Sequence, residues 1–215
     1  MNDNIHGYIE SLLQPRTGLL AEMEQYAAEH HVPIMEPVGM DTLLAAMKLQ
    51  KPGRLLEIGT AIGYSALRMA TAVPGLHITT LERDEERFDK ATQYISQSGE
   101  QSRIRILLGD ALELAEQAAE DGPFDAIFID AAKGQYRRFF ELYEPMLKPG
   151  GVIYSDNVLF KGYAAGIEAP SKRLEKMVQK ITDYNEWLMA HPGYDTSIIP
   201  AGDGIAISIK RSEEK

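Results

Sequence analysis

Residues 55–64 read L-L-E-I-G-T-A-I-G-Y, a pattern typical of a strand, a turn and the start of a helix. A short apolar run ends in Gly59 and Gly63, and a helical pattern begins at the following tyrosine. The backbone N–H groups of such a strand–turn–helix unit can face a polar ligand. The spacing is G-x-x-x-G, whereas dinucleotide-binding folds use G-x-G-x-x-G, and Ala61 stands where the middle glycine would be. Phosphate binding is therefore not indicated, and the glycines alone fit a simple tight turn equally well.

Short apolar strands alternate with helical patterns after this turn. Strands are predicted over residues 54–58, 77–81, 104–108, 124–129 and 152–155, with a closing hairpin over 194–199 and 205–210. Helices are predicted over residues 5–13, 19–28, 38–49, 64–72, 85–98, 111–119, 135–146 and 171–190. The alternation predicts a Rossmann-like α/β sheet, mostly parallel, with helices on both faces and a C-terminal antiparallel hairpin. We expect a single domain over residues 1–215, with a helical extension and lid over 1–50 and the core over 51–215.

The amino-acid composition and the charge exclude several kinds of site and of protein. The chain has 215 residues, a formal net charge of -10 and no cysteine, which excludes disulfides and thiolate metal sites. It has no apolar run of about 18 residues and no signal-peptide pattern, so we expect a cytoplasmic protein without a membrane span. The acidic balance argues against a nucleic-acid coat protein. Residues 131–180 are nevertheless locally basic, with nine basic side chains against five acidic ones.

Acidic residues mark the ends of the predicted strands. Glu57 lies near the end of the first strand, Glu82 ends the second, Asp110 follows the third and Asp130 follows the fourth. Ligands of open α/β sheets bind at the carboxyl ends of the strands. A nucleoside that needs no phosphate site and is held by carboxylates indicates S-adenosylmethionine, whose sulfonium and amino groups are cationic.

A second set of polar residues indicates a metal site. Asp130 ends the fourth strand, and Asp156 and Asn157 end the fifth, so their side chains should meet at one edge of the sheet. Carboxylate and amide oxygens suit Mg²⁺. Lys133 lies beside this set and is a candidate general base. Taken singly, each acid also fits a cap or a turn, and Lys133 also fits a surface lysine.

These motifs resemble the cation-dependent O-methyltransferases of the catechol and caffeoyl-CoA type, within the class I S-adenosylmethionine-dependent fold. The matching segments are E-I-G-T-A-I-G-Y-S (57–65), L-E-R (81–83), G-D-A (109–111), D-A-A-K (130–133) and D-N-V-L (156–159). The resemblance implies Asp130, Asp156 and Asn157 as Mg²⁺ ligands and Lys133 as the base. It implies cofactor contacts from the lid segment H-H-V-P-I-M-E-P (30–37) and from Met35, Glu57, Gly59, Gly63, Ser65, Glu82, Asp110, Ala111 and Asp130.

Further segments, such as F-I-D-A-A-K-G-Q-Y (128–136) and I-I-P-A-G-D-G (198–204), resemble the bacterial tRNA 5-hydroxyuridine methyltransferases. That resemblance implies a homodimer and methylation of 5-hydroxyuridine at the tRNA wobble position to 5-methoxyuridine. A small catechol or caffeoyl-type phenol stays the alternative substrate, because it also offers two adjacent oxygens.

A nucleoside-binding regulator is the alternative without catalysis, but the intact metal and base residues argue against it. Candidate RNA contacts, which fit ordinary surface charge equally well, are Arg137, Arg138, Lys161, Lys172 and Arg173.

Overall fold

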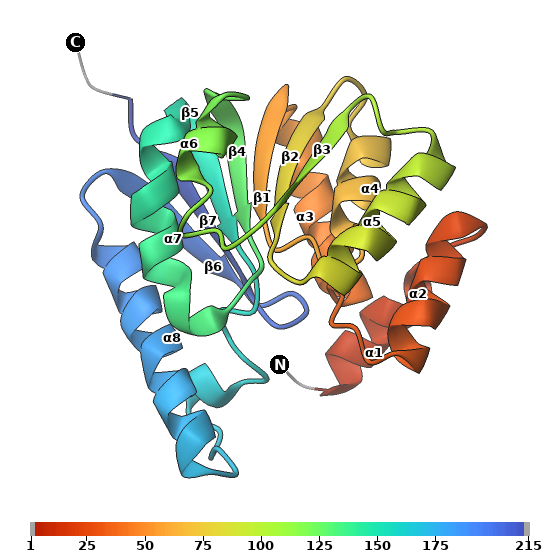
Figure 1. Ribbon diagram of the computed structural model, residues 1–215. Coiled ribbons are helices and arrows are strands. Elements are labelled where there is room, and N and C mark those ends of the chain that lie inside the picture. Colours follow the sequence, from red (N-terminus) through yellow and green to blue (C-terminus); the bar gives the residue numbers. More distant parts are fainter. Residues whose placement is uncertain (1–2, 213–215) are drawn as a thin grey trace.

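A seven-stranded sheet with the order β3-β2-β1-β4-β5-β7-β6 forms the centre of the molecule (Figure 1). The computed structural model describes residues 3–212. β1 to β5 are parallel, and β7 runs antiparallel to both of its neighbours. The predicted α/β fold is confirmed. The strands are β1 (Arg54–Ile58), β2 (His77–Glu82), β3 (Ile104–Leu108), β4 (Phe124–Ile129), β5 (Leu147–Ser155), β6 (Tyr194–Ile199) and β7 (Ile205–Lys210).

Helices cover both faces of the sheet. The α-helices are α1 (Asp3–Leu12), α2 (Leu19–Glu29), α3 (Pro37–Gln50), α4 (Tyr64–Ala72), α5 (Glu85–Ser98), α6 (Ala115–Ala119), α7 (Tyr136–Tyr143) and α8 (Lys172–Ala190). Short 3₁₀ turns are η1 (Lys133–Gln135), η2 (Glu144–Met146) and η3 (Tyr163–Ala165). Side chains of α2 to α5 share one core with the sheet, and side chains of α6 to α8 share the core on the opposite face (Figure 1).

The central strands are apolar because both of their faces are covered. Leu55, Leu56 and Ile58 of β1 are fully buried, with Leu55 in one core and the other two in the opposite core. Burying one such side chain contributes about 1.5–3 kcal/mol. Two helices begin at capping side chains: Asp84 accepts from the backbone of Arg87 before α5, and Ser171 caps α8 in the same way.

Three predicted boundaries were wrong. α6 begins later than predicted because Asp110 forms a turn, in which its carboxylate accepts from the N–H of Leu112 at 2.9 Å. The predicted helix over 135–146 is divided into η1, α7 and η2, since Pro145 lacks the N–H that would continue α7. β5 begins at Leu147 and not at the predicted residue 152, and the added residues lie where its register with β4 shifts. The division of the chain at residue 50 stays a prediction.

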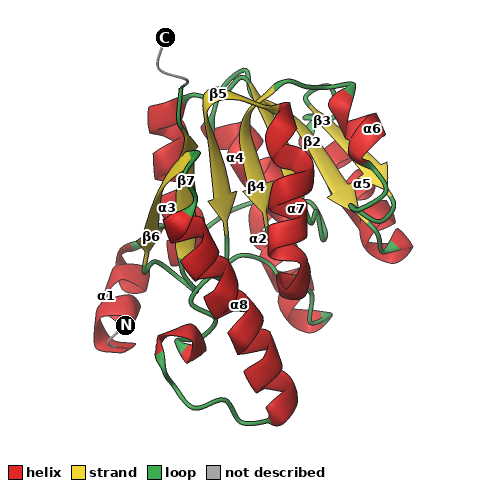
Figure 2. Cartoon of the chain, turned by 90° about the vertical axis from the view of Figure 1, so that its left-hand side faces the viewer, coloured by secondary structure: helices red, strands yellow, loops and turns green. Residues whose placement is uncertain are grey.

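The carboxyl ends of the parallel strands meet at one end of the molecule. In Figure 2 the arrowheads of β4 and β5 point toward the end where α8 projects beyond the sheet. The β6–β7 connection lies at this end as well, because β7 runs antiparallel to β5. Within residues 3–212, none of the helices has the length and apolar character needed to cross a membrane.

Candidate active site

A cavity of about 500 Å³ opens at the carboxyl ends of β1 to β5. This volume suits a small-molecule ligand. Most of the predicted site residues line it: Met35, Gly59, Ser65, Glu82, Asp110, Ala111, Asp130, Lys133, Asp156 and Asn157. Glu57, Gly63 and the five candidate RNA contacts do not. The cavity therefore brings the predicted nucleoside residues and the predicted metal residues into one space.

Gly59 allows β1 and β4 to approach each other at the cavity floor. Its φ of +104° is disfavoured for other residues, and a Cβ at this position would collide with the carbonyl oxygen of Asp130. Gly63 has a φ of +83° and begins α4, where a Cβ would meet only side-chain and Cα atoms at 3.4 Å or more. Gly59 thus controls the spacing of the cavity floor, and Gly63 controls the entry into the helix.

Glu82 is the most firmly held acid of the cavity. One carboxylate oxygen accepts from the N–H of Ala61 at 2.7 Å, and the other accepts from the N–H groups of Arg83 and Asp84 at 3.0 Å each. These bonds fix the carboxylate where β2 ends and beside the glycine turn of β1. A carboxylate has about four acceptor positions, so these three bonds leave one of them for a ligand hydroxyl.

Glu57 lies behind the cavity wall. It is fully buried, and its carboxyl group accepts hydrogen bonds from Ser65 Oγ and from Thr80 Oγ1. Burial raises the pKa of Glu57 to about 8, against the opposing effect of these two hydrogen bonds. Glu57 therefore positions Ser65, which lines the cavity, from underneath.

The two aspartates of the predicted metal site are close enough to affect each other. Burial, and after it the charge of Asp130, raises the pKa of Asp156 well above its usual value. The pKa of Asp130 is also raised by burial, and the charge of Lys133 opposes this. Asn157 donates from Nδ2 to Asp156 at 3.1 Å and accepts from Lys133 Nζ at 2.5 Å. All four groups thus form one connected cluster.

This cluster fits a divalent cation. The carboxylate of Asp156 is buried and that of Asp130 is half-buried, and a cation stabilises two such neighbouring carboxylates that repel each other. An amide oxygen completes a set of hard ligands. Asn157 has a φ of 57°, which turns its side chain back toward Asp156. Among the described residues, histidine, cysteine, aspartate and glutamate side chains form no metal-binding group of three or more. The fit therefore depends on the amide of Asn157.

The loop after Asn157 is held by the β6–β7 connection, which the sequence predicts only as the link between the two strands of the closing hairpin. The carbonyl of Asp203 accepts from the N–H of Leu159 at 2.9 Å, and its carboxylate accepts from the N–H of Lys161. The charge of Asp203 also contributes to the raised pKa of Asp156. Asp203 was missed because its partners lie about forty residues away in the chain.

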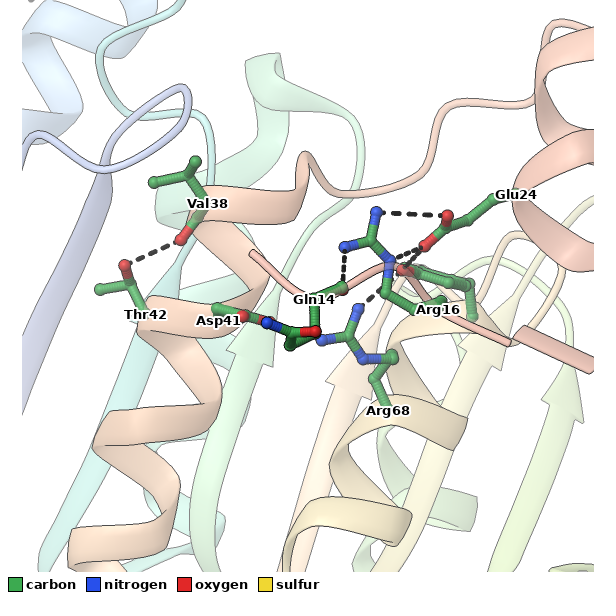
Figure 3. Close-up of polar contacts among 8 residues, drawn as sticks. Gln14, Arg16, Glu24, Val38, Asp41, Thr42 and Arg68 are labelled. Carbon is green, nitrogen blue, oxygen red and sulfur yellow. Dashed lines mark hydrogen bonds and ion pairs between the residues drawn. The ribbon is translucent and has the colours of Figure 1, made fainter. Parts of the chain in front are cut away.

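The N-terminal segment closes the cavity on another side. Pro33, Ile34, Met35 and Glu36 line it, and the role of this segment as a lid over the cofactor stays a prediction. Figure 3 shows polar contacts of this part of the chain: Arg16 donates to Glu24 within the N-terminal segment, and Arg68 of α4 donates to Asp41 of α3, which attaches the segment to the core.

Tyr64 connects the two ion pairs of Figure 3. Its hydroxyl donates to Glu24 at 2.5 Å and accepts from Arg68 at 2.7 Å. Because Tyr64 also lines the cavity, the polar network reaches from the N-terminal segment to the cavity wall. The spacing of these residues in the sequence did not predict this network.

The candidate RNA contacts lie outside the cavity, on or near α7 and α8. Arg137 donates to Glu141 and lies over the ring of Trp187 at 4.9 Å, so it is partly engaged within the protein. Lys180 was not among the candidates, but its Nζ lies next to Gly134, within η1 beside Lys133. All five candidates are exposed: Arg137, Arg138, Lys161, Lys172 and Arg173.

Known proteins are similar in sequence to this chain over nearly its whole length. A caffeoyl-CoA O-methyltransferase of Stellaria longipes is 28% identical over 95% of this chain and 89% of its own length. A catechol O-methyltransferase of Niastella koreensis is 30% identical, with 96% of each chain covered.

Solved structures agree with these relatives. A Staphylococcus aureus protein described as a candidate caffeoyl-CoA O-methyltransferase superposes with a TM-score of 0.90 at 38% identity, covering 97% of this chain and 100% of that one. An O-methyltransferase from Bacillus cereus, solved with S-adenosylhomocysteine, gives 0.82 at 28% identity and 97% coverage of both chains. The family model described as "O-methyltransferase" matches residues 11–211. The chain therefore belongs to the O-methyltransferase family, as a class I S-adenosylmethionine-dependent member of its caffeoyl-CoA and catechol type.

Proposed function

We propose that this protein transfers a methyl group from S-adenosylmethionine to a hydroxyl group that has a second oxygen beside it, with the help of a divalent cation. One observation carries the proposal: Lys133 and the cluster of Asp130, Asp156 and Asn157 share a cavity with the nucleoside-binding edge at Glu82. A base, a metal site and a cofactor site within one cavity are the parts that such a transfer needs.

The cofactor roles are assigned along the wall of the cavity. Glu82, fixed by three backbone N–H groups, would accept from the ribose hydroxyls. Asp110 and Ala111 would contact the adenine. The methionine end would lie near Gly59 and Ser65, and Met35 of the lid segment would cover the ligand.

Lys133 would move the proton. In its neutral amine form, with its ammonium proton already lost to solvent, Lys133 would leave Asn157 and accept the proton of the substrate hydroxyl at Nζ. The substrate oxygen would then bond to the methyl carbon as the carbon–sulfur bond breaks, with S-adenosylhomocysteine as the leaving group. Mg²⁺, when held by Asp130, Asp156 and Asn157, would supply positive charge that favours the ionised hydroxyl. The cavity holds both reactants close together, which reduces the entropic part of the barrier.

A small phenol with adjacent hydroxyls is the substrate class that the comparisons favour. The curated relatives described above are named for caffeoyl-CoA and catechol, and both align over nearly the full chain. The ring of Phe160 lies 5.6 Å from Lys133 Nζ, so an aromatic surface is present beside the proposed base.

The wobble uridine of tRNA is the second candidate, and the basic face of α8 favours it. Lys172, Lys176 and Lys180 recur every four residues, so they share one side of the helix. The last of them lies next to η1, beside the proposed base. A 5-hydroxyuridine presents O4 and O5 as adjacent oxygens, and the lysines would contact its phosphates.

The two substrates can be separated in one experiment. The protein would be incubated with methyl-labelled S-adenosylmethionine and either a catechol or tRNA that carries 5-hydroxyuridine, each with Mg²⁺ or with EDTA. Label in the catechol that EDTA abolishes would support the first candidate. Label in tRNA alone would support the second, and its rate should then fall as salt rises. Label in neither substrate would contradict the proposal.

The proposed base can be tested with a matched pair of lysine variants. Lys133→Met should lower turnover by about 10²- to 10⁴-fold, because it removes the proton acceptor and keeps most of the side-chain length. Lys48→Met alters an exposed lysine at the end of α3 and should leave turnover unchanged. Normal turnover in Lys133→Met would remove this residue from the mechanism.

The homodimer stays a prediction. Three apolar side chains of α1 support it, because Ile5, Tyr8 and Leu12 are each more than half exposed. A molar mass measured in solution by light scattering should be twice that of the chain, and a monomeric mass would contradict it.

A further inference from the structure

The connection between β6 and β7, residues 200–204, contacts two segments that approach the cavity from different sides. One is the predicted lid segment with the start of α3, toward which the connection extends (Figure 1). The other is the loop at residues 158–161, here called the Phe160 loop. The lid segment and Asn157 line the cavity, whereas the connection and the Phe160 loop do not. The connection therefore joins two sides of the cavity from outside it.

Gly202 and Gly39 bring two backbones into close contact. Gly202 has a φ of +57°, and a Cβ at this position would lie only 3.1 Å from the N and Cα atoms of Gly39 in α3. A Cβ on Gly39 would in turn lie 3.3 Å from Cε of Met35 and 3.7 Å from the carbonyl oxygen of Ala201. Met35 lines the cavity. Because neither glycine has a Cβ, the connection packs directly against the end of the lid segment that lines the cavity.

The same connection holds the Phe160 loop by its backbone. The N–H of Val158 donates to the carbonyl of Gly204 at 3.0 Å, and the N–H of Leu159 donates to the carbonyl of Asp203 at 2.9 Å. The N–H of Lys161 donates to the carboxylate of Asp203. A Cβ at Gly204 would collide with the side chain of Leu159, so the two segments also pack closely. Three of the four loop residues are therefore bonded to two residues of the connection.

Phe160 is the loop residue whose conformation depends on these bonds. Its φ is 46° and that of Lys161 is 56°, values that residues other than glycine seldom adopt unless the surrounding structure fixes them. The ring of Phe160 lies 5.6 Å from Nζ of Lys133 and packs edge-on against Tyr163 at 5.7 Å. The connection thus fixes the aromatic surface beside the proposed base.

We propose that residues 201–204 couple the cofactor site to the Phe160 loop, so that a ligand that holds the lid segment in place also orders the loop beside the base. The inference rests on the cofactor site of the proposed function. The ligand favours the state in which Met35 is packed on Gly39, that contact supports Gly202, and Asp203 holds the loop. Gly202 and Asp203 are then positioning residues, because neither lines the cavity. Coupling between two sites is reciprocal, so a substrate held by the loop also strengthens cofactor binding.

Hydrogen exchange of backbone amides, followed by NMR, tests this coupling with S-adenosylhomocysteine, which binds without reacting. In wild type, the saturating ligand should slow exchange at the amides of Leu159 and Lys161 by about 5-fold or more. This slowing is counted beyond any at the amide of Arg211, which bonds to the carbonyl of Gly193 at the other end of the hairpin and reports overall stabilisation. In Gly202→Ala the added Cβ separates the connection from α3, so the slowing should be lost.

Two further variants make the test specific. Gly99→Ala is the matched control, because Gly99 also has a positive φ, of +78°, but no described atom beyond its chain neighbours lies within 4 Å of the added Cβ. Its slowing by the ligand should equal that of wild type. Asp203→Ala removes the carboxylate bond to Lys161 and keeps the carbonyl bond to Leu159. The slowing should then fall at Lys161 and persist at Leu159.

The outcomes separate this inference from the proposed function. Bound S-adenosylhomocysteine that leaves exchange at Leu159 and Lys161 unchanged in wild type would overturn the coupling and leave the cofactor site intact. Wild-type slowing in Gly202→Ala would assign the effect to the route through Asn157, which lines the cavity, and would overturn the role of Gly202. Equal loss in Gly202→Ala and Gly99→Ala would also overturn it, because backbone strain alone would explain the loss. A wild-type protein that binds no S-adenosylhomocysteine in calorimetry would overturn the cofactor site, and the coupling with it.

Discussion

Replacing Glu57 with glutamine should change how stability depends on pH. The pKa of Glu57 rises from 4.5 to about 8 in the folded protein, chiefly because the carboxyl group is fully buried. Between these two values the folded state holds one proton more than the unfolded state. Stability from this group is therefore fully present below about pH 4.5 and is lost as the pH rises through about 8.

The size of the change in stability follows from the pKa shift of Glu57. One pKa unit corresponds to about 1.4 kcal/mol, so the whole transition represents on the order of 3–5 kcal/mol. Glutamine is neutral at every pH and nearly isosteric, and its amide can still bond to Ser65 and Thr80. Wild type should therefore lose about 1.4 kcal/mol per pH unit relative to Glu57→Gln between pH 6 and pH 8.

Urea unfolding of both proteins at several pH values would measure this difference. Asp130 and Asp156 also have raised pKa values, but they are present in both proteins, so their contribution largely cancels in the comparison. A difference in the free energy of unfolding that stays constant from pH 6 to pH 8 would refute the reasoning. Glu57 would then be ionised in the folded protein in spite of its burial.

Three further predictions concern the cavity and its supports. Gly59→Ala should lower the free energy of unfolding by more than about 3 kcal/mol, because strain at positive φ adds to a backbone collision. Gly63→Ala should lower it by only about 1–2 kcal/mol, because no backbone carbonyl is in the way. Equal losses in the two variants would contradict this explanation. Tyr64→Phe removes the hydroxyl that links Glu24 to the cavity wall, so it should lower the free energy of unfolding by about 1–3 kcal/mol. It should also weaken the binding of S-adenosylmethionine measured by calorimetry. Unchanged stability and affinity would mean that this hydroxyl does not couple the N-terminal segment to the cavity. Asp203→Ala should speed hydrogen exchange at the amide of Lys161, and equal exchange would mean that the carboxylate does not hold this loop.

The strand ends and their acids could be predicted from the sequence because strand patterns and turns are local. Leu55 to Ile58 are apolar except at Glu57, and the glycine turn follows at once. What the pattern did not reveal is the face to which Glu57 points. A parallel strand is buried on both faces, so alternation gives no direction, and Glu57 lies beneath the cavity instead of in it.

Contacts between segments that are far apart in the sequence could not be predicted from local sequence patterns. The bond from Tyr64 to Glu24 spans forty residues, and the support of Lys161 by Asp203 spans forty-two. The local excess of basic side chains also did not indicate which of them are engaged by other residues of the protein. Arg137 is engaged by Glu141 and Trp187, whereas Lys180, which was not singled out, reaches η1.

The strand order has a consequence for synthesis on the ribosome. β1 to β3 carry the residues proposed to bind the nucleoside and are made first. β5 gains β7 as its outer neighbour only when residues 205–210 have emerged. The loop that carries Asn157 likewise waits for Asp203. A nascent chain that stops before the last hairpin would thus hold the residues proposed to bind the cofactor, but the loop of the proposed metal ligand Asn157 would lack its support. Such unfinished chains should be unable to methylate, so the residues translated last decide when the catalyst becomes active.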